Sequence, residues 1–214
     1  MKKLPIVLLA TLIGGAAFAQ TPTIKYGLKA GVSLPKYQYK NVNGDDSETK
    51  SSTNFHVTGY MDAGITPMFS IQPGVSLQGK GGKFFDNSNV SNKDNTLWIE
   101  IPVNLVAKFP ITAGTGTQLF LGAGPYAGFG IAGQNETESS STKVSRDIKF
   151  GSDNGDDLKG TDFGVNFLGG FEMGNGFTLG AGYGMGLTDL RPNSSGGDGK
   201  KTNRVWSFSA GFLF

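Results

Sequence analysis

The amino-acid sequence predicts an all-β protein: an eight-stranded antiparallel up-and-down transmembrane β-barrel with short periplasmic turns and long extracellular loops. Glycine accounts for 34 of the 214 residues and phenylalanine for 16. This composition disfavours helices, because glycine destabilises a helix interior. Beyond residue 20, apolar residues recur at every second position rather than at helical spacing. Polar connections of alternating length separate these stretches, as on the two rims of a membrane barrel.

Four alternating stretches fill the first half of the chain. In WIEIPVNLVAKF, the clearest of them, Ile99, Ile101 and Val103 share one face, while Glu100 and Asn104 share the other. A period of two is that of a β-strand with two unlike faces. The four stretches are Ile24–Leu34, Phe55–Gly64, Phe69–Gly81 and Trp98–Phe109.

Four glycine-rich stretches repeat the pattern in the second half. In FTLGAGYGMGL, the apolar residues Phe177, Leu179 and Tyr183 alternate with polar or glycine positions. The last stretch, RVWSFSAGFLF, alternates to its final residue, and we expect it to close the barrel against Ile24–Leu34, because closure removes the edges of an open sheet. The four stretches are Gln118–Ile131, Asp162–Glu172, Phe177–Leu187 and Arg204–Phe214.

The connections between the stretches are short on one rim and long on the other. Short turns are expected at 65–68, at about 110–117 and at 174–176. A structureless segment as long as 132–161 is unusual in a compact soluble domain, but it is ordinary on the outer rim of a membrane barrel. The segments predicted as long polar loops are roughly 40–53, 83–96, 132–161 and 189–202.

The apolar face of the strands is interpreted as facing lipid. It carries essentially no charge, and a charge at the membrane midplane costs about 2–4 kcal/mol. The other face is rich in glycine. In a narrow lumen, glycine leaves room for Trp98, Phe120 and Tyr126. The alternative is a soluble barrel or sandwich, in which this face would be exposed and its glycines would weaken the strands. Aromatic residues form two expected girdles, with Tyr26, Phe69, Phe109, Phe171, Phe177 and Phe214 at the turn end, and Phe55, Phe129, Phe163 and Trp206 at the loop end.

Polar and charged residues on the inward face predict a filled lumen. An eight-stranded barrel is narrow enough for its side chains to fill it, so a wide pore is not expected. Buried charges are expected to pair with one another, and a narrow ion or solute path past them is the alternative. The predicted interior polar cluster is Lys29, His56, Asp62, Gln72, Lys80, Glu100, Asn104, Lys108 and Glu172.

Residues 1–19, MKKLPIVLLATLIGGAAFA, are predicted to be a secretory signal peptide that is cleaved. Lys2 and Lys3 precede an apolar stretch that is too short to span a membrane, and Ala17 and Ala19 fit an A-x-A cleavage site. An uncleaved anchor helix is the alternative, which two glycines inside the run disfavour. We expect the barrel domain to comprise the remaining residues, 20–214.

The charge of the mature chain excludes some partners. Without the two lysines of the signal peptide, basic and acidic residues number 17 each. The only basic cluster is the pair Lys200–Lys201, so no nucleic-acid partner is expected. The chain contains no cysteine, which excludes a disulfide framework and a lipidated amino terminus.

Several stretches resemble the outer-membrane β-barrel domain family of the PorT type. They are YGLKAGVSL, GYMDAGI, SIQPGVSLQGKGG, LWIEIPVNLVAKF and GAGPYAG, followed by the aromatic terminal strand. The resemblance covers residues 24–214. It implies an eight-stranded barrel integral to the outer membrane of a Gram-negative cell, but it implies no single activity; the namesake is associated with a protein-secretion machine.

The C-terminal aromatic residues suggest a partner in biogenesis. Trp206, Phe208, Phe212 and Phe214 share the lipid-facing side of the last stretch. Ending in phenylalanine, the stretch resembles the signal by which the outer-membrane assembly machinery recognises its clients. We therefore predict an assembly signal at these four residues.

Candidate catalytic and metal-binding groups are few. The one histidine, His56, lies near Ser51 and Ser52 in sequence and shares its face with Asp62, but it points inward, whereas a lipid-modifying enzyme needs its histidine and serine at the lipid. The acidic run Asp153–Asp157 has a spacing that fits Ca²⁺ but lacks the rest of an EF-hand loop. No catalytic residue, cofactor or metal is predicted, and a solvated acidic loop is expected.

Three functions follow, in order of preference. The first is a structural or interaction barrel that sits in outer-membrane lipid and presents its extracellular loops to an envelope protein not identified by the sequence. The second is a narrow channel or a component of a secretion assembly. The third is a lipid-modifying enzyme.

Overall fold

The computed structural model describes residues 23–41, 45–87, 90–111, 114–139, 142–153, 155–192 and 199–214. The predicted signal peptide lies outside these ranges. No helix in the described ranges is long and apolar enough to span a membrane. The strands are β1 (Ile24–Lys40), β2 (Asp46–Glu48), β3 (Asn54–Gly64), β4 (Phe69–Asn87), β5 (Val90–Pro110), β6 (Gln118–Ser139), β7 (Thr142–Asp147), β8 (Thr161–Glu172), β9 (Phe177–Gly186) and β10 (Lys200–Leu213).

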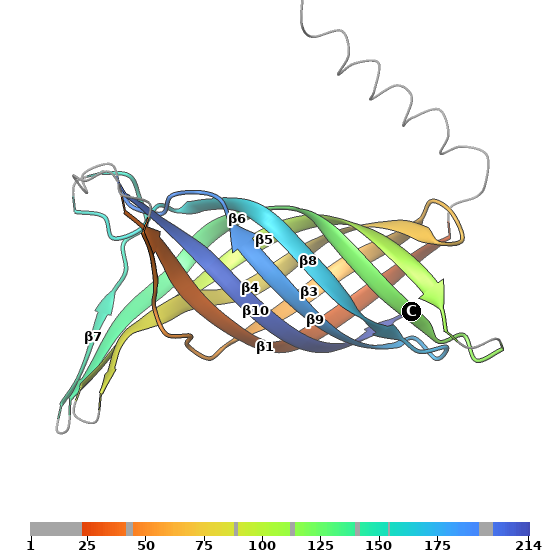
Figure 1. The fold of residues 1–214 in the computed structure, drawn as a ribbon, viewed down its shortest axis with the longest axis horizontal. Coiled ribbons are helices and arrows are strands. Elements are labelled where there is room, and N and C mark those ends of the chain that lie inside the picture. Colours follow the sequence, from red (N-terminus) through yellow and green to blue (C-terminus); the bar gives the residue numbers. More distant parts are fainter. Residues whose placement is uncertain are drawn as a thin grey trace, which may run out of the picture.

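Eight of the strands form a closed ring of antiparallel neighbours (Figure 1). Its order is β1, β3, β4, β5, β6, β8, β9 and β10, and β10 pairs again with β1 from Gly27↔Leu213 to Lys40↔Lys200. The pairing continues to the end of the chain, because Tyr26 and Phe214 exchange both backbone hydrogen bonds at 2.9 Å. The predicted eight-stranded barrel, closed by its aromatic terminal strand, is thereby confirmed.

The two faces of the strands meet different surroundings. On β5, Ile101 and Leu105 are about half exposed on the outside of the barrel, while Trp98 and Glu100 are buried within it. This is the reverse of a soluble protein, and it places the apolar face against lipid. The outward aromatic residues that mark the two rims are Tyr26, Phe69, Phe109, Phe171 and Phe214 at the turn end, and Phe55, Phe129, Phe163 and Trp206 at the loop end.

The short turns lie together at the rim that holds both ends of the barrel, and the segment 65–68 joins β3 to β4 there. The turn between β8 and β9 closes with a hydrogen bond from the Met173 amide to the Phe177 carbonyl. It needs glycine at Gly176, whose φ of +91° is a conformation that residues with a Cβ rarely adopt.

The prediction of polar loops is wrong for large parts of two segments. Much of 83–96 belongs to the hairpin of β4 and β5, and 132–161 contains the end of β6 and all of β7. These strands project beyond the loop-end aromatic ring, where water reaches both faces, so the hydrophobic alternation that marks a strand is absent. Cross-strand polar pairs hold them instead: Lys93 Nζ lies 3.1 Å from Glu136, and Asn92 donates to Thr137 at 2.7 Å.

The other two predicted loops contain shorter ordered pieces. The segment 40–53 holds β2, which pairs with the end of β1, and a bridge between Lys50 and Lys83. The segment 189–202 includes the first residues of β10. Among the described residues, the extracellular end of the barrel is therefore largely sheet.

Candidate functional site in the barrel lumen

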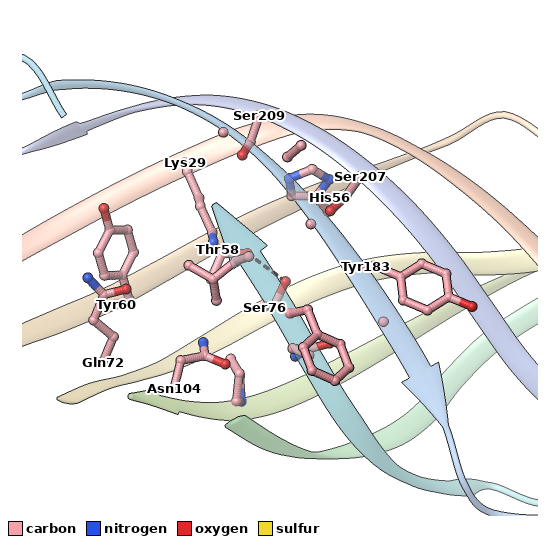
Figure 2. A pocket seen from close by; sticks show the side chains of 18 of the residues that line it. Lys29, His56, Thr58, Tyr60, Gln72, Ser76, Asn104, Tyr183, Ser207 and Ser209 are labelled. Carbon is pink, nitrogen blue, oxygen red and sulfur yellow. Dashed lines mark hydrogen bonds between the residues drawn. The ribbon is translucent and has the colours of Figure 1, made fainter. Parts of the chain in front are cut away.

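The lumen contains a cavity of about 100 Å³ in the middle of the barrel. Figure 2 shows several of the side chains that reach into it, from β1, β3, β4, β5 and β10. Of the nine residues of the predicted interior cluster, Asp62 alone does not line this cavity; it lies at the turn-side mouth. The other eight do: Lys29, His56, Gln72, Lys80, Glu100, Asn104, Lys108 and Glu172.

An ion network of Asp62, Lys108 and Glu172, here called the turn-side network, bounds the cavity on the side of the short turns. The Lys108 ammonium pairs with the Asp62 carboxylate and lies 2.8 Å from the carboxylate of Glu172. Lys25 reaches Glu172 from the rim at 3.8 Å. A second cavity of about 250 Å³ lies outside this network and shares Lys108 and Glu172 with the first, so the network separates the lumen from the mouth.

A second network of Lys80, Glu100 and Asp162, here called the loop-side network, bounds the cavity at the extracellular end. The Lys80 ammonium lies 2.5 Å from Glu100 and 2.7 Å from Asp162. Tyr126 and Asn203 also donate to Asp162, at 3.0 and 2.9 Å. All five side chains are buried. An ammonium this deep is tolerable because two carboxylates pair with it.

The sequence did not reveal Asp162, a member of this network, or Asn203, which donates a hydrogen bond to it. Asp162 is the first residue of the alternating stretch DFGVNFLGGFE and lies on its polar face, so the pattern contained the signal. Asn203 continues the inward register of Ser207 and Val205 by one step beyond the predicted strand, at the position between that strand and the predicted loop 189–202. Both strands are longer than their hydrophobic pattern.

A hydrophobic cluster covers the loop-side network from outside the membrane. Tyr37, Trp98, Ile148, Leu158 and Leu190 are buried there, with Tyr39, Phe84 and Phe150 packed against them. We call the five buried residues the cap. Trp98 joins the cap to the lumen, because its ring packs edge-on against Phe150 at 5.3 Å and also lies 5.2 Å from the Lys80 ammonium.

Lys201 lies at the edge of the cap, five residues outward from Trp206 of the loop-end aromatic ring. Its ammonium is 3.9 Å from the centre of the Tyr37 ring and 3.8 Å from a carboxylate oxygen of Asp94. Burial lowers the pKa of Lys201 to about 8, although Asp94 opposes the shift. Together the cap and the loop-side network close the extracellular end of the lumen.

Glycines on the inner wall make room for the large side chains of the lumen, as expected from the sequence. A Cβ on Gly164 would lie 2.5 Å from the Tyr126 ring, and a Cβ on Gly170 would lie 2.8 Å from the Phe120 ring. The same Cβ atoms would lie 2.3 Å from the Met185 carbonyl oxygen and 2.1 Å from that of Leu179. Interior packing is dense, so an alanine at either position requires both the ring and the neighbouring backbone to move.

The histidine makes a structural contact. The Ser33 hydroxyl lies 3.1 Å from Nδ1 of His56, and the Gln78 amide donates to the same hydroxyl at 2.8 Å. Ser52 is held elsewhere, because its amide donates to the Pro35 carbonyl, and Asp62 belongs to the turn-side network. The residues considered for lipid chemistry are therefore not brought together around His56.

The acidic run is engaged by its own neighbours. Asp157 forms a two-point ion pair with Arg146 at 2.8 and 2.9 Å, which lowers the pKa of the Asp157 carboxyl, and the Lys149 amide donates to it at 2.9 Å. Asp156 accepts from the Asp153 amide. Among the described residues, no group of three or more His, Cys, Asp or Glu side chains is arranged to hold a metal ion.

The closed ring, the lipid-facing apolar surface and the polar lumen define a small transmembrane β-barrel of the outer-membrane class. Residues 18–191 match the family model described as an outer membrane protein beta-barrel domain. The chain belongs to this family, and it is an integral protein of the outer membrane. The family model does not single out the PorT type.

Several solved outer-membrane proteins are similar to this chain at low sequence identity. Ail of Yersinia pestis has 11% identity over 89% of this chain and 98% of its own, with a TM-score of 0.43. Neisserial surface protein A has 12% identity over 91% and 98%, with a TM-score of 0.45. OprG of Pseudomonas aeruginosa has 11% identity over 90% and 97%, with a TM-score of 0.47. No curated protein matches the sequence.

Proposed function

We propose that this barrel is a closed anchor whose extracellular strands bind an envelope or external protein. The observation that carries the proposal is the projecting sheet at the extracellular end, formed by the ends of β4, β5 and β6 together with β7 (Figure 1). We call this sheet the outer extension. It continues the barrel wall beyond the aromatic ring, so the membrane-spanning strands hold it rigidly.

The outer extension offers a strand edge for pairing. β7 pairs with β6, and no other described strand pairs with it. The Ile148 amide donates to the Gly133 carbonyl, so in the alternating pattern of an antiparallel ladder the backbone groups of Lys143 and Ser145 point away from β6. Every side chain of β7 is exposed. Such an edge is a template for an added strand.

The partner that fits this edge is an extended polypeptide segment. Backbone pairing gives affinity, and side chains at alternate positions give specificity. Val144 is 58% exposed and provides an apolar contact at the centre of the strand. This chemistry supports a protein partner over a small molecule.

A pair of substitutions at one position tests the proposal. Ser145→Pro removes an amide that points away from β6, whereas Ser145→Ala retains that amide and loses only the hydroxyl. A photo-crosslinking residue at Val144 in intact cells is expected to capture the same protein with Ser145 and with Ser145→Ala, and to lose it with Ser145→Pro. Capture that is unchanged by proline would overturn the edge-pairing mode. Unchanged heat-modifiable mobility in gels shows that each variant has folded.

The proposal includes the absence of conduction and of enzymatic activity. Support for the first comes from the cap and the loop-side network, which fill the extracellular end. Support for the absence of enzymatic activity comes from His56, whose Nδ1 lies 3.1 Å from the Ser33 hydroxyl inside the lumen. Reproducible unitary currents of the wild-type protein in planar bilayers would favour the narrow channel instead. A change in lipid A chemistry that depends on His56→Ala would favour the enzyme.

We also propose that the last strand is read by the assembly machinery before the barrel closes. Trp206, Phe208, Phe212 and Phe214 are each 46–69% exposed on the lipid-facing side of the folded barrel, and so are available as one apolar row in the unfolded chain. Phe214→Ala is expected to reduce the amount of barrel in the outer membrane while leaving refolding of the purified chain in detergent unchanged. Equal losses in both assays would indicate a purely structural role.

A further inference from the structure

The lysine in the centre of the lumen differs from the two lysines above and below it. Lys80 and Lys108 each lie between two carboxylates. Lys29 forms no ion pair and no hydrogen bond through its ammonium in the described part of the chain, and its nearest aromatic partner is the Tyr60 ring, 5.6 Å away at the centroid. An ammonium inside a barrel wall that lacks a counter-charge is unfavourable.

The neighbours of Lys29 form a pocket of hydroxyl groups. On β3, Thr58 lies opposite Lys29, and on β10 Ser207 and Ser209 lie opposite the next inward positions of β1. Neither serine hydroxyl forms a hydrogen bond with another described residue. Figure 2 shows these side chains directed into the cavity from β1, β3 and β10. Three adjacent strands thus place one cation and two free hydroxyl donors around one space.

The neighbouring strand, β9, leaves that space empty of side chains. β9 presents Gly180, Gly182 and Gly184 to the same cavity. A Cβ on Gly182 would lie 2.7 Å from the Ser207 hydroxyl. A single methyl group at this position would therefore intrude on the cavity.

We propose that the lumen binds a small monovalent anion between the Lys29 ammonium and the hydroxyls of Ser207 and Ser209. A charge-assisted hydrogen bond from Lys29 supplies the main attraction, and the two hydroxyls complete the shell. Lys80 and Glu100 of the loop-side network also line the cavity, and this network holds two carboxylates against one ammonium. A second negative charge on the ligand would be repelled by this surplus, so a monovalent carboxylate or halide fits better than sulfate.

The anion reaches the cavity from the periplasmic side. The cap closes the extracellular end, whereas the turn-side network separates the cavity from a second, larger cavity at the mouth. Lys25 at that mouth is about half exposed, and it adds positive charge where an anion would enter.

The single histidine provides a reporter for the test. His56 lines the cavity and is the one histidine in the chain, so its imidazole gives a single set of NMR signals. The folded barrel in detergent micelles would be titrated with sodium acetate, which replaces sodium gluconate at constant ionic strength, because gluconate is too bulky for the cavity. We expect a saturable shift of the His56 signal.

Three variants decide the interpretation. Lys29→Met is expected to weaken acetate binding about tenfold or more, because it removes the charged donor. Gly182→Ala is expected to weaken it without any change of charge, and it keeps the test valid if Lys29→Met does not fold. Lys25→Met removes the same charge at the entrance and not at the binding site, so any effect is expected on the rate of entry. The affinity is expected to stay within about twofold, since an exposed charge contributes little.

Two outcomes would overturn the proposal. One is a shift that does not saturate, or that is the same in Lys29→Met as in the wild-type protein. The other is sulfate binding at least as tightly as acetate, which contradicts the monovalent class. Chloride that gives the same order of variants as acetate supports the class and identifies the halide as a sufficient ligand.

Discussion

The two ion networks of the lumen have the same composition, one lysine between two carboxylates, but different surroundings. In the loop-side network, Asp162 also accepts from Tyr126 and Asn203, and the cap excludes water above it. In the turn-side network, Lys108 adjoins an open cavity, and Lys25 pairs with Glu172 from the rim at 3.8 Å. Burial and added hydrogen bonds, rather than the number of charges, therefore distinguish the structural loop-side network from the solvent-facing turn-side network.

The largest effect is expected when the loop-side network is broken. Asp162→Asn removes one counter-charge of Lys80 inside the barrel, and breaking a buried ion pair from one side costs about 3–5 kcal/mol. The free energy of unfolding, measured by urea titration in lipid vesicles, is the check. If the free energy of unfolding fell by less than about 1 kcal/mol, Glu100 alone would be a sufficient counter-charge for Lys80, and the loop-side network would not act as one cooperative unit.

A change in the cap, which covers the loop-side network, is expected to reduce stability nearly as much. Leu158→Ala removes a buried leucine, which costs about 2–5 kcal/mol, and we expect local opening of the extracellular end rather than global unfolding. Faster hydrogen exchange around Ile148 and Leu190 is the measurement. Leu121→Ala, on the lipid-facing surface of the barrel, is the control that leaves the exchange of the cap unchanged.

The same kind of change in the turn-side network is expected to be milder. Glu172→Gln leaves Lys108 with Asp62 and with access to the mouth, so the cost should be about 1 kcal/mol. The urea titration used for Asp162→Asn measures it. Equal losses in the two variants would remove the distinction between the networks.

The smallest effect is expected outside the lumen, at the ion pair of Asp157 with Arg146. The pKa of Asp157 is lowered in the folded state, so its contribution to stability is present above the ordinary carboxyl pKa, about 3.9, and is lost as the pH falls through the lowered value. Protection of the Lys149 amide, which donates to Asp157, should disappear over that range. In Arg146→Met the loss should begin at a higher pH; an unchanged midpoint would contradict the assignment.

Much of the barrel could be predicted from the sequence, because lipid imposes a strict pattern on the residues that face it. Ile99 to Phe109 shows an apolar side chain at each lipid-facing position. The closing role of Arg204–Phe214 followed from the same alternation, and the pairing of β10 with β1 confirms it.

The outer extension could not be predicted in this way. Residues such as Lys93 and Asn135 have water on both sides, so no hydrophobic period marks their strands. They form a sheet because backbone pairing and polar cross-strand contacts extend the ladder of β5 and β6 beyond a register shift between Leu97 and Trp98. The contact of Asp162 on β8 with Lys80 on β4 depends on which strands face each other across the lumen, and this becomes defined only when the ring has closed.

The seam between β1 and β10 has a consequence for the speed of folding. The other neighbouring pairs in the barrel wall join positions no more distant than Gln118 and Glu172, but the seam joins positions as distant as Gly27 and Leu213. Contacts between residues so far apart form slowly, since chain entropy must be lost before they are gained. Closure of the seam is therefore the expected late step of folding. Until it occurs, two unpaired strand edges remain exposed, so the rate of closure limits how long the chain is vulnerable to aggregation.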